Sequence, residues 1–312
     1  MRPYGSTSVM LFFFVISIIT AVLVSAFMPQ DYRAFGEDVD DPTNPLWYIG
    51  MVVIFTFFIL WLARKGGDRV IQVIILFAVG MTMYFVLRPL VWQLTSYVVA
   101  EVLSLQVALV LTYGLYKFPE WYVVDLSGLL VAAGATAIFG ISLSILPALV
   151  LMTVLAVYDA IAVYRTKHMV DLADSVMDLR LPILLVVPKE RDYSFMEQAS
   201  IKQEIAEGKE REAMFMGLGD IIIPGVLVVS TFTFLPDVLG DVDVAGIPGN
   251  WLVSAATLAG AMGGFMALMW FVWKGRPQAG LPLLNSGAFL GYLISVLLVY
   301  QKLGINWFGT II

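Results

Sequence analysis

The chain has 312 residues, of which 60% are hydrophobic and 13% are charged, and its formal net charge is -6. This composition excludes a soluble globular domain, in which about half of the residues are apolar and about a quarter are charged. The absence of cysteine excludes disulfide frameworks and thiolate metal sites, and one histidine, His168, is too few for a zinc site that needs two histidines on one helix face.

The apolar runs predict an all-α polytopic membrane protein. Each run is long enough to cross the roughly 30 Å of hydrocarbon in a bilayer at about 1.5 Å per residue. We expect nine transmembrane helices, at 9–27, 46–63, 70–87, 90–116, 121–141, 143–164, 213–235, 251–273 and 283–300. The first run also resembles a signal peptide, because Arg2 precedes it and Val24-Ser25-Ala26 is similar to a cleavage site. Its apolar region exceeds the usual length of about 7–15 residues, which favours a retained span.

The distribution of basic residues predicts the orientation of these spans. Lys and Arg accumulate on the cytoplasmic side of membrane proteins. With the N-terminus inside, 15 of the 18 Lys and Arg lie on the inner side and the acidic loops 29–45 and 236–250 lie outside. We therefore expect a cytoplasmic N-terminus and a C-terminus outside. The chain then divides into a six-span part (1–164), a flexible cytoplasmic loop (165–212) and a three-span part (213–312).

Four acidic residues lie within the predicted spans, where an ionisable group is costly and indicates function by default. Asp125 lies four residues into its span, close enough to the inner interface to be hydrated. Glu101 lies near the outer surface if its span starts at about Tyr97, and otherwise requires a buried structural partner. Asp159 and Asp220 differ, because they lie on consecutive antiparallel spans at similar depths of about 9 Å and about 12 Å from the inner face.

Two carboxylates held close together cannot both ionise, so a pair of this kind shares one proton. The ionised member can take a proton from water while the protonated member polarises a peptide carbonyl, and no metal or cofactor is needed. The sequence around Asp220 reads "GLGD", residues 217–220. Gly217 and Gly219 lack a Cβ, so a neighbouring helix or a substrate backbone can approach Asp220 closely.

These motifs resemble those of the GxGD intramembrane aspartyl proteases, the family of presenilin and signal peptide peptidase. The resemblance rests on "YD" at 158–159, a long cytoplasmic loop, "GLGD" at 217–220 and "PLL" at 282–284, where the family has Pro-Ala-Leu. The orientation predicted above is similar to that of presenilins and opposite to that of signal peptide peptidases. The compact chain looks like the microbial branch of the family.

The resemblance implies a role for each motif. Asp159 and Asp220 would be the catalytic pair, with Tyr158, Gly217, Leu218 and Gly219 as the supporting motif. Pro282, Leu283 and Leu284 would support the site and help to receive substrate. It also implies transmembrane helical substrates, no required accessory subunit and the plasma membrane of a prokaryote. A homo-oligomer is compatible with it, and nucleic acid is not an expected partner.

The segment "LPILLVVP", residues 181–188, precedes the second catalytic span and suits either of two structures. A substrate helix must unwind before its carbonyls can be attacked, and the extended segment could pair with a protein strand. On that interpretation Leu181, Leu184, Leu185 and Val186 bind substrate. The alternative is an interfacial segment that lies on the membrane.

Two other functions are compatible with acids inside spans. A proton- or cation-coupled transporter could use them as a relay, although it would be expected to have repeated halves with matching broken helices. A prepilin-type peptidase shares GxGD, but it usually has fewer spans. Cleavage of a single-span peptide distinguishes the protease from the transporter.

Overall fold

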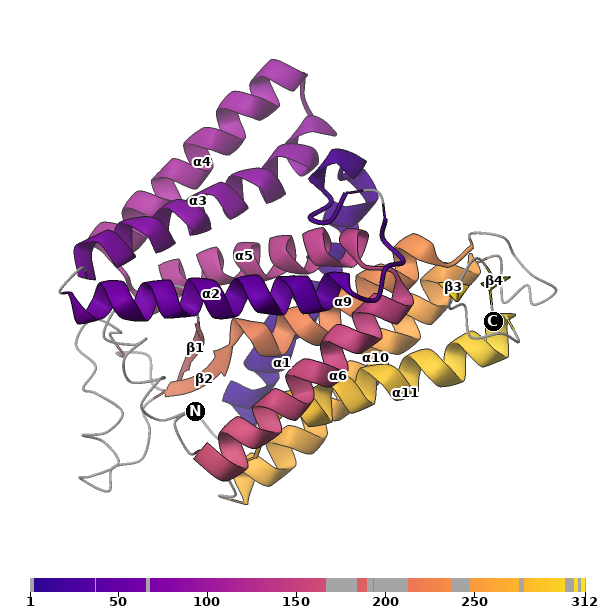
Figure 1. Ribbon diagram of the computed structural model, residues 1–312. Helices are drawn as coiled ribbons and strands as arrows, with labels where there is room; N and C mark the ends of the chain where they lie inside the picture. The colour runs from indigo at the N-terminus through magenta and orange to yellow at the C-terminus, as the bar shows by residue number, and fades with distance from the viewer. Residues whose placement is uncertain are drawn as a thin grey trace. The chain divides into compact units, whose positions relative to one another are not determined.

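The computed structural model describes residues 3–36, 38–65, 68–166, 184–189, 193, 213–236, 247–274, 278–300, 306–307 and 310–311. Nine α-helices lie within these ranges (Figure 1): α1 (Pro3–Phe27), α2 (Asn44–Arg64), α3 (Asp68–Trp92), α4 (Tyr97–Lys117), α5 (Trp121–Ser142), α6 (Ile145–Ile161), α9 (Leu218–Phe234), α10 (Gly249–Trp273) and α11 (Gly280–Tyr300). A 3-10 turn η1 (Gln30–Tyr32) and a π-helical turn η2 (Ala162–Thr166) accompany them. Strand β1 (Leu184–Pro188) pairs antiparallel with β2 (Ala213–Gly217), and β3 (Asn306–Trp307) with β4 (Thr310–Ile311).

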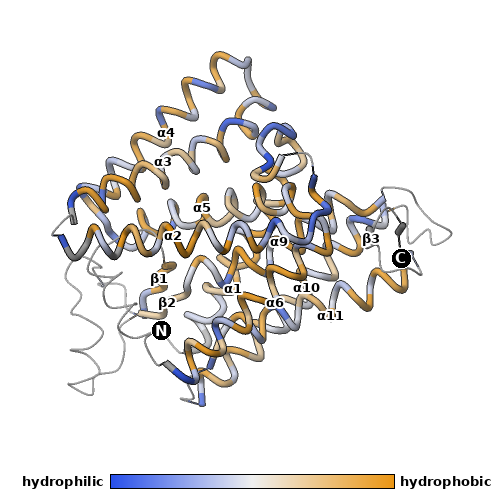
Figure 2. Tube along the Cα trace, in the orientation of Figure 1, coloured by the Kyte–Doolittle hydropathy of each residue, from blue (hydrophilic) through white to orange (hydrophobic). Residues whose placement is uncertain are grey.

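The helices are those of an integral membrane protein. Hydrophobic residues predominate along them, as the colouring in Figure 2 shows. In the described part of the chain, seven helices are long and apolar enough to cross a membrane, namely α1, α3, α4, α5, α6, α10 and α11. Two shorter apolar helices lie at Asn44–Ile59 and Leu218–Phe234. The multi-pass helical prediction is therefore confirmed, while the count of nine spans and the orientation of the termini stay predictions.

The chain packs as two compact units. Unit 1 comprises Met1–Phe13, Ile49–Gly134 and Lys167–Leu218, and unit 2 comprises Phe14–Tyr48, Ala135–Thr166 and Gly219–Ile312. Helices α1, α2, α5 and α9 contribute residues to both units. The division of the sequence at 165–212 stays a prediction, because most of that loop lies outside the described residues.

Unit 1 contains the α3–α4 pair and the β1–β2 sheet. Side chains from both helices, from α5 and from both strands form one hydrophobic core, which includes Leu76, Val79, Met83, Ala108, Leu115, Val124, Val186, Tyr193 and Ala213. At α4, Arg88 Nε lies 2.7 Å from Glu101 Oε2, and the Tyr84 hydroxyl donates to the other Glu101 oxygen. Helix α4 begins at Tyr97, the start for which Glu101 was expected near the outer surface, and there Glu101 pairs with these two side chains of α3.

Unit 2 is built around the α10–α11 pair, whose helices run side by side (Figure 1). Glycines allow the two backbones to touch, because a Cβ added to Gly260 would lie 2.2 Å from the Gly287 carbonyl oxygen. Helix α11 also packs on α6, where Asn285 Nδ2 donates to the Met152 carbonyl oxygen at 2.9 Å. Both acids of the predicted pair belong to this unit.

The strands correct the all-α prediction. The span predicted at 213–235 begins with strand β2, and its helix starts only at Leu218. Extended backbone is favoured here because Gly217 is a poor helix former and "LLVVP" supplies a β-branched strand for Ala213–Gly217 to pair with. Residues 184–188 are thus a strand, as one of the two interpretations expected, and whether this strand lies at the membrane surface stays a prediction. Leu181 lies outside the described residues.

Candidate active site

Asp159 lies near the end of α6, two residues before the α-helical hydrogen bonding stops at Ile161. The chain continues directly into the π-helical turn Ala162–Thr166. Such wider turns are rare and are frequent at functional sites. The Asp159 side chain is only 8% exposed. An otherwise apolar helix therefore holds a buried carboxylate where its regular geometry changes.

Asp220 lies in the first turn of α9, three residues after β2 ends at Gly217. A helix N-terminus favours negative charge because its backbone N–H groups are unpaired there. Pro224 lies one turn further along the helix and has no N–H, so the Asp220 carbonyl loses its usual helical partner. The depth of about 12 Å expected for Asp220 assumed a continuous helix from 213, and strand β2 removes that basis.

The start of α11 brings the two acids to one short stretch of backbone. The Leu281 N–H donates to Asp159 Oδ2 at 3.1 Å, and the Gly280 N–H makes a further backbone interaction with the same carboxylate. A Cβ added to Gly280 would lie 3.2 Å from Asp220 Oδ1. The two carboxylates are close enough to interact electrostatically. The Gly280–Leu281 segment therefore lies against both carboxylates.

This arrangement is suited to acid–base chemistry on water. Two carboxylates that repel each other can share one proton, which leaves one as a base and the other as an acid. The free N–H groups at the N-terminus of α11 stabilise a negative charge on Asp159. Among the described residues, no group of three His, Cys, Asp or Glu side chains lies close enough to hold a metal ion.

The Pro282 motif forms the first turn of α11, directly after Gly280 and Leu281. Proline is favoured in the first turn of a helix, where its missing N–H has no role. Leu284 is fully buried, whereas Pro282 and Leu283 are half-buried. The motif thus fixes the helix start that holds Asp159.

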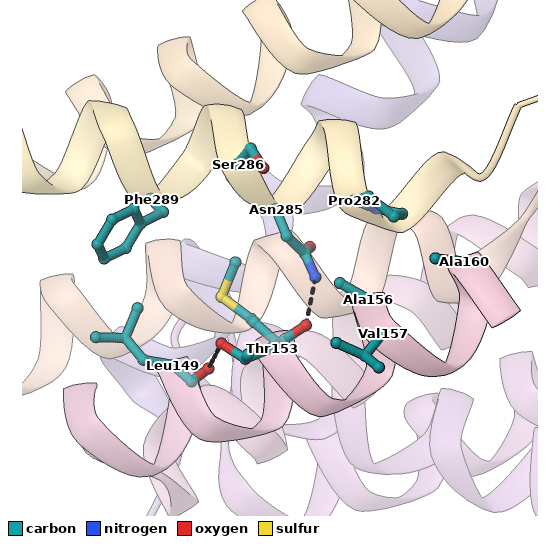
Figure 3. A pocket seen from close by; sticks show the side chains of 10 residues that line it. Leu149, Thr153, Ala156, Val157, Ala160, Pro282, Asn285, Ser286 and Phe289 are labelled. Atoms are coloured by element: carbon teal, nitrogen blue, oxygen red, sulfur yellow. Dashed lines mark hydrogen bonds between the residues drawn. The ribbon is translucent and has the colours of Figure 1, made fainter.

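A pocket of about 390 Å³ lies between α6 and α11 beside this motif (Figure 3). Its lining is mainly apolar and comprises Leu149, Met152, Thr153, Ala156, Val157 and Ala160 from α6, with Pro282, Asn285, Ser286 and Phe289 from α11. Ala160 is the neighbour of Asp159 in the sequence. The Asn285 amide donates to Met152, while Asn285 Oδ1 is buried and has no hydrogen-bond partner among the described residues.

The other predicted site residues lie in different surroundings. Tyr158 is 69% exposed, Gly217 ends β2, and Gly219 is exposed with open space where a Cβ would be. Leu218 is buried and packs on Gly128 of α5. Leu184, Leu185 and Val186 form the first part of β1, in which Leu185 and Val186 are fully buried.

Sequence reasoning missed two residues at this site and misjudged one acid elsewhere. Gly280 and Leu281 contact the acids through their backbone, and the only signal for them was their place directly before Pro282. Asp125 was expected to be hydrated, and that expectation is wrong. The side chain is 3% exposed and accepts a hydrogen bond from the Val186 N–H at 2.7 Å, because strand β1 packs on this face of α5.

Comparison with known proteins identifies the family. The family model described as signal-peptide peptidase, presenilin aspartyl protease matches residues 10–300. The chain belongs to this family. Members of the family are intramembrane aspartyl proteases, so the chain is a hydrolase and neither of the two alternative functions is supported.

Solved structures agree with the signal-peptide peptidase and presenilin assignment. A presenilin family intramembrane aspartate protease in space group C222 is 36% identical, with a TM-score of 0.66, over 96% of this chain and 100% of that one. A structure of such a protease in space group P2 is also 36% identical, with a TM-score of 0.65, over 93% of this chain and 96% of that one. Among curated proteins, no sequence matches.

Proposed function

We propose that Asp159 and Asp220 are the catalytic pair of this protease, and that they hydrolyse peptide bonds within the transmembrane helices of single-span membrane proteins. One observation carries the proposal: both carboxylates lie against Gly280–Leu281 and interact with each other. Each comes from a helix that is otherwise apolar, so two ionisable side chains that are costly inside a membrane lie at the same site.

The contacts of the two acids suggest which one is the base. Asp159 accepts the Leu281 N–H, and this donor stabilises its ionised form. Asp220 then carries the shared proton. Asp159 takes a proton from water as the water oxygen bonds to the scissile carbonyl carbon, and Asp220 donates its proton to the carbonyl oxygen. The tetrahedral intermediate collapses as the C–N bond breaks: the amide nitrogen receives the proton held by Asp159, and one hydroxyl of the intermediate returns a proton to Asp220, leaving an acid, an amine and the starting protonation of the pair.

Substrate must be extended before this reaction, because the carbonyls of an intact helix are already hydrogen-bonded within it. We propose that the β1–β2 sheet receives the extended segment at the outer edge of β2. The Val186 N–H is donated to Asp125, so it points away from β2. Its register partner Phe215 therefore presents its own backbone groups away from β1. That edge ends at Gly217, three residues before Asp220.

On this proposal the residues of β1 that were predicted to bind substrate act indirectly, because β1 pairs with β2 and β2 receives the substrate. Leu185 and Val186 belong to the strand that pairs with β2. Pro282 borders the apolar pocket between α6 and α11. The chain works with a cytoplasmic N-terminus, in the plasma membrane of a prokaryote and without an accessory subunit. The sequence supports this orientation, since 15 of 18 Lys and Arg fall on one side.

The test is cleavage of a single-span peptide by the protein purified in detergent. The wild type is expected to release two fragments that mass spectrometry can place within the span. Asp159→Asn and Asp220→Asn remove one acid each at nearly constant volume, and each is expected to abolish cleavage. Cleavage that persists in either variant would contradict the pair, whereas failure of every protein, including the wild type, would contradict the activity itself.

A further inference from the structure

Asp125 is a buried carboxylate that the reaction proposed above does not use. It lies in the first half of α5, within unit 1, and is only 3% exposed. Burying an ionisable group inside a membrane protein is costly unless it is paired. No cation is paired with it among the described residues; its recorded partner is the Val186 backbone N–H, 2.7 Å from Oδ1. Such a position requires an explanation.

The partner lies in the middle of β1, on the side of the strand that faces away from β2. Unpaired backbone groups on a strand edge are a ready place for wrong pairing, and proteins commonly cover them. Along this edge the outward positions are Leu184, Val186 and Pro188, because backbone direction alternates along a strand. Pro188 has no N–H, and Asp125 accepts the one at Val186. Asp125 and Pro188 therefore leave one edge of the sheet with little capacity to accept a strand.

The same face of α5 holds the strand by packing. Gly128, one helical turn after Asp125, contacts two leucines. A Cβ at Gly128 would be 3.1 Å from Leu185 Cδ2 and 3.5 Å from Leu218 Cδ2. Leu185 belongs to β1, and Leu218 is the first residue of α9. Packing of this kind is not directional, so it holds a strand against a helix without fixing its register. A hydrogen bond to one named N–H does fix it.

We propose that Asp125 is a positioning residue: its carboxylate holds Val186 and thereby sets the register of the β1–β2 sheet, which continues through Leu218 and Gly219 to Asp220. Its effect on catalysis rests on the function proposed above, in which the sheet receives the extended substrate. A one-residue slip of β1 would reverse the faces of all its side chains, so a fixed register also fixes which peptide bond is presented.

The proposal is tested first without activity, by hydrogen–deuterium exchange in the full-length protein. Asp125→Ala removes the acceptor, and Asp125→Asn keeps an oxygen in the same place. We expect the amides of 184–187 to exchange at least about tenfold faster in Asp125→Ala and at the wild-type rate in Asp125→Asn. Met83→Ala is the matched control, because Met83 lies in the same hydrophobic core without contacting this edge through a hydrogen bond.

The second measurement is the distribution of cleavage positions in a single-span peptide. Asp125→Ala is expected to broaden it, whereas Asp125→Asn and Met83→Ala are expected to cleave at the wild-type positions. The proposal is overturned by wild-type exchange or a wild-type product pattern in Asp125→Ala, or by Asp125→Asn behaving like Asp125→Ala. If the wild type cleaves nothing, the proposed function fails, and the exchange rates still decide whether Asp125 holds β1.

Discussion

Gly280 and Leu281 join the two acids to the start of α11 through backbone atoms alone. Leu281 offers an N–H to Asp159, and Gly280 offers space to Asp220. Because a side chain at Gly280 would occupy that space, the glycine is required for the approach and not for an unusual backbone angle. Gly280, which has no side chain, therefore affects how closely Asp159 and Asp220 can approach each other.

Gly280→Ala tests this control. The new Cβ would lie 3.2 Å from Asp220 Oδ1, which is tighter than ordinary contact, so the carboxylate must shift by a few tenths of an ångström. Small misplacement of a reacting group is costly, and we expect kcat for peptide cleavage to fall by about tenfold or more. Gly50→Ala on α2 is the control, since no atom lies within 4 Å of its added Cβ. Equal activity of both variants would contradict the close approach.

The pH dependence of cleavage tests whether the acids share a proton. At low pH both Asp159 and Asp220 are protonated and no base remains, and at high pH both are ionised and no acid remains. A plot of kcat/KM against pH is therefore expected to be bell-shaped, with limbs that belong to the pair and not to either residue. A constant rate from about pH 4 to about pH 9 would be inconsistent with a shared proton.

At the scale of elements, the α10–α11 pair is the most closely packed part of unit 2. A Cβ on Gly260 would lie 2.2 Å from the Gly287 oxygen and 3.0 Å from Gly291 Cα, both of them backbone atoms. Backbone atoms cannot move away by rotation about a side-chain bond, as the end of a flexible side chain can. The helix that begins at the candidate site is therefore anchored by contacts that tolerate no added atom.

Gly260→Ala is expected to destabilise the protein, although alanine is the better helix former by about 1 kcal/mol. Overpacking commonly costs about 1–3 kcal/mol and is at its largest when backbone must move, so the clash outweighs the gain. Gly263→Ala on the same helix meets nothing within 4 Å and should keep or raise the melting temperature in detergent. A Gly260→Ala protein as stable as the wild type would show that the helices are less tightly apposed.

Helices and acids were more accessible to sequence reasoning than strands and backbone contacts. Long apolar runs have one physical solution in a bilayer, so seven of the predicted spans correspond to helices long enough to cross it. Acids inside such runs are costly enough to stand out, which singled out Asp159 and Asp220. The strand at Ala213–Gly217 was missed because its partner is distant in the sequence, and apolarity alone does not distinguish a short strand from a helix start.

Asp125 shows the same limit for a single residue. Its depth in the predicted span suggested contact with water, because depth was the only property of its surroundings that could be derived from the sequence. The burial of Asp125 depends on β1, which reaches it from 61 residues further along the chain. Gly280 and Leu281 were equally hard to foresee, since their contribution comes from backbone atoms that every residue has.

At the scale of the whole molecule, charge is distributed unevenly along the chain. The predicted inner side holds 15 of the 18 Lys and Arg, and acidic loops fall on the other side. Basic loops are retained on the cytoplasmic side during insertion, so this distribution fixes orientation more than it affects the fold. The proposed orientation would place the two acids toward the cytoplasmic half of the bilayer.

The lack of cysteine makes orientation directly measurable. We expect Thr43→Cys, in the predicted outer loop 29–45, to react in intact cells with a maleimide that does not cross membranes. Ser175→Cys, in the predicted inner loop 165–212, should react only after the membrane is opened. The reverse labelling pattern would place the N-terminus outside and contradict the orientation.

The meeting of the two acids is measured most directly by cross-linking the double variant Asp159→Cys/Asp220→Cys, in which the only thiols occupy the two positions. After mild oxidation to form a disulfide, the chain is cut within 165–212 and analysed without reductant. The account predicts that the two pieces stay covalently joined and separate on reduction, while either single variant gives separate pieces. Pieces that separate in the double variant despite two reactive thiols would show that Asp159 and Asp220 do not meet.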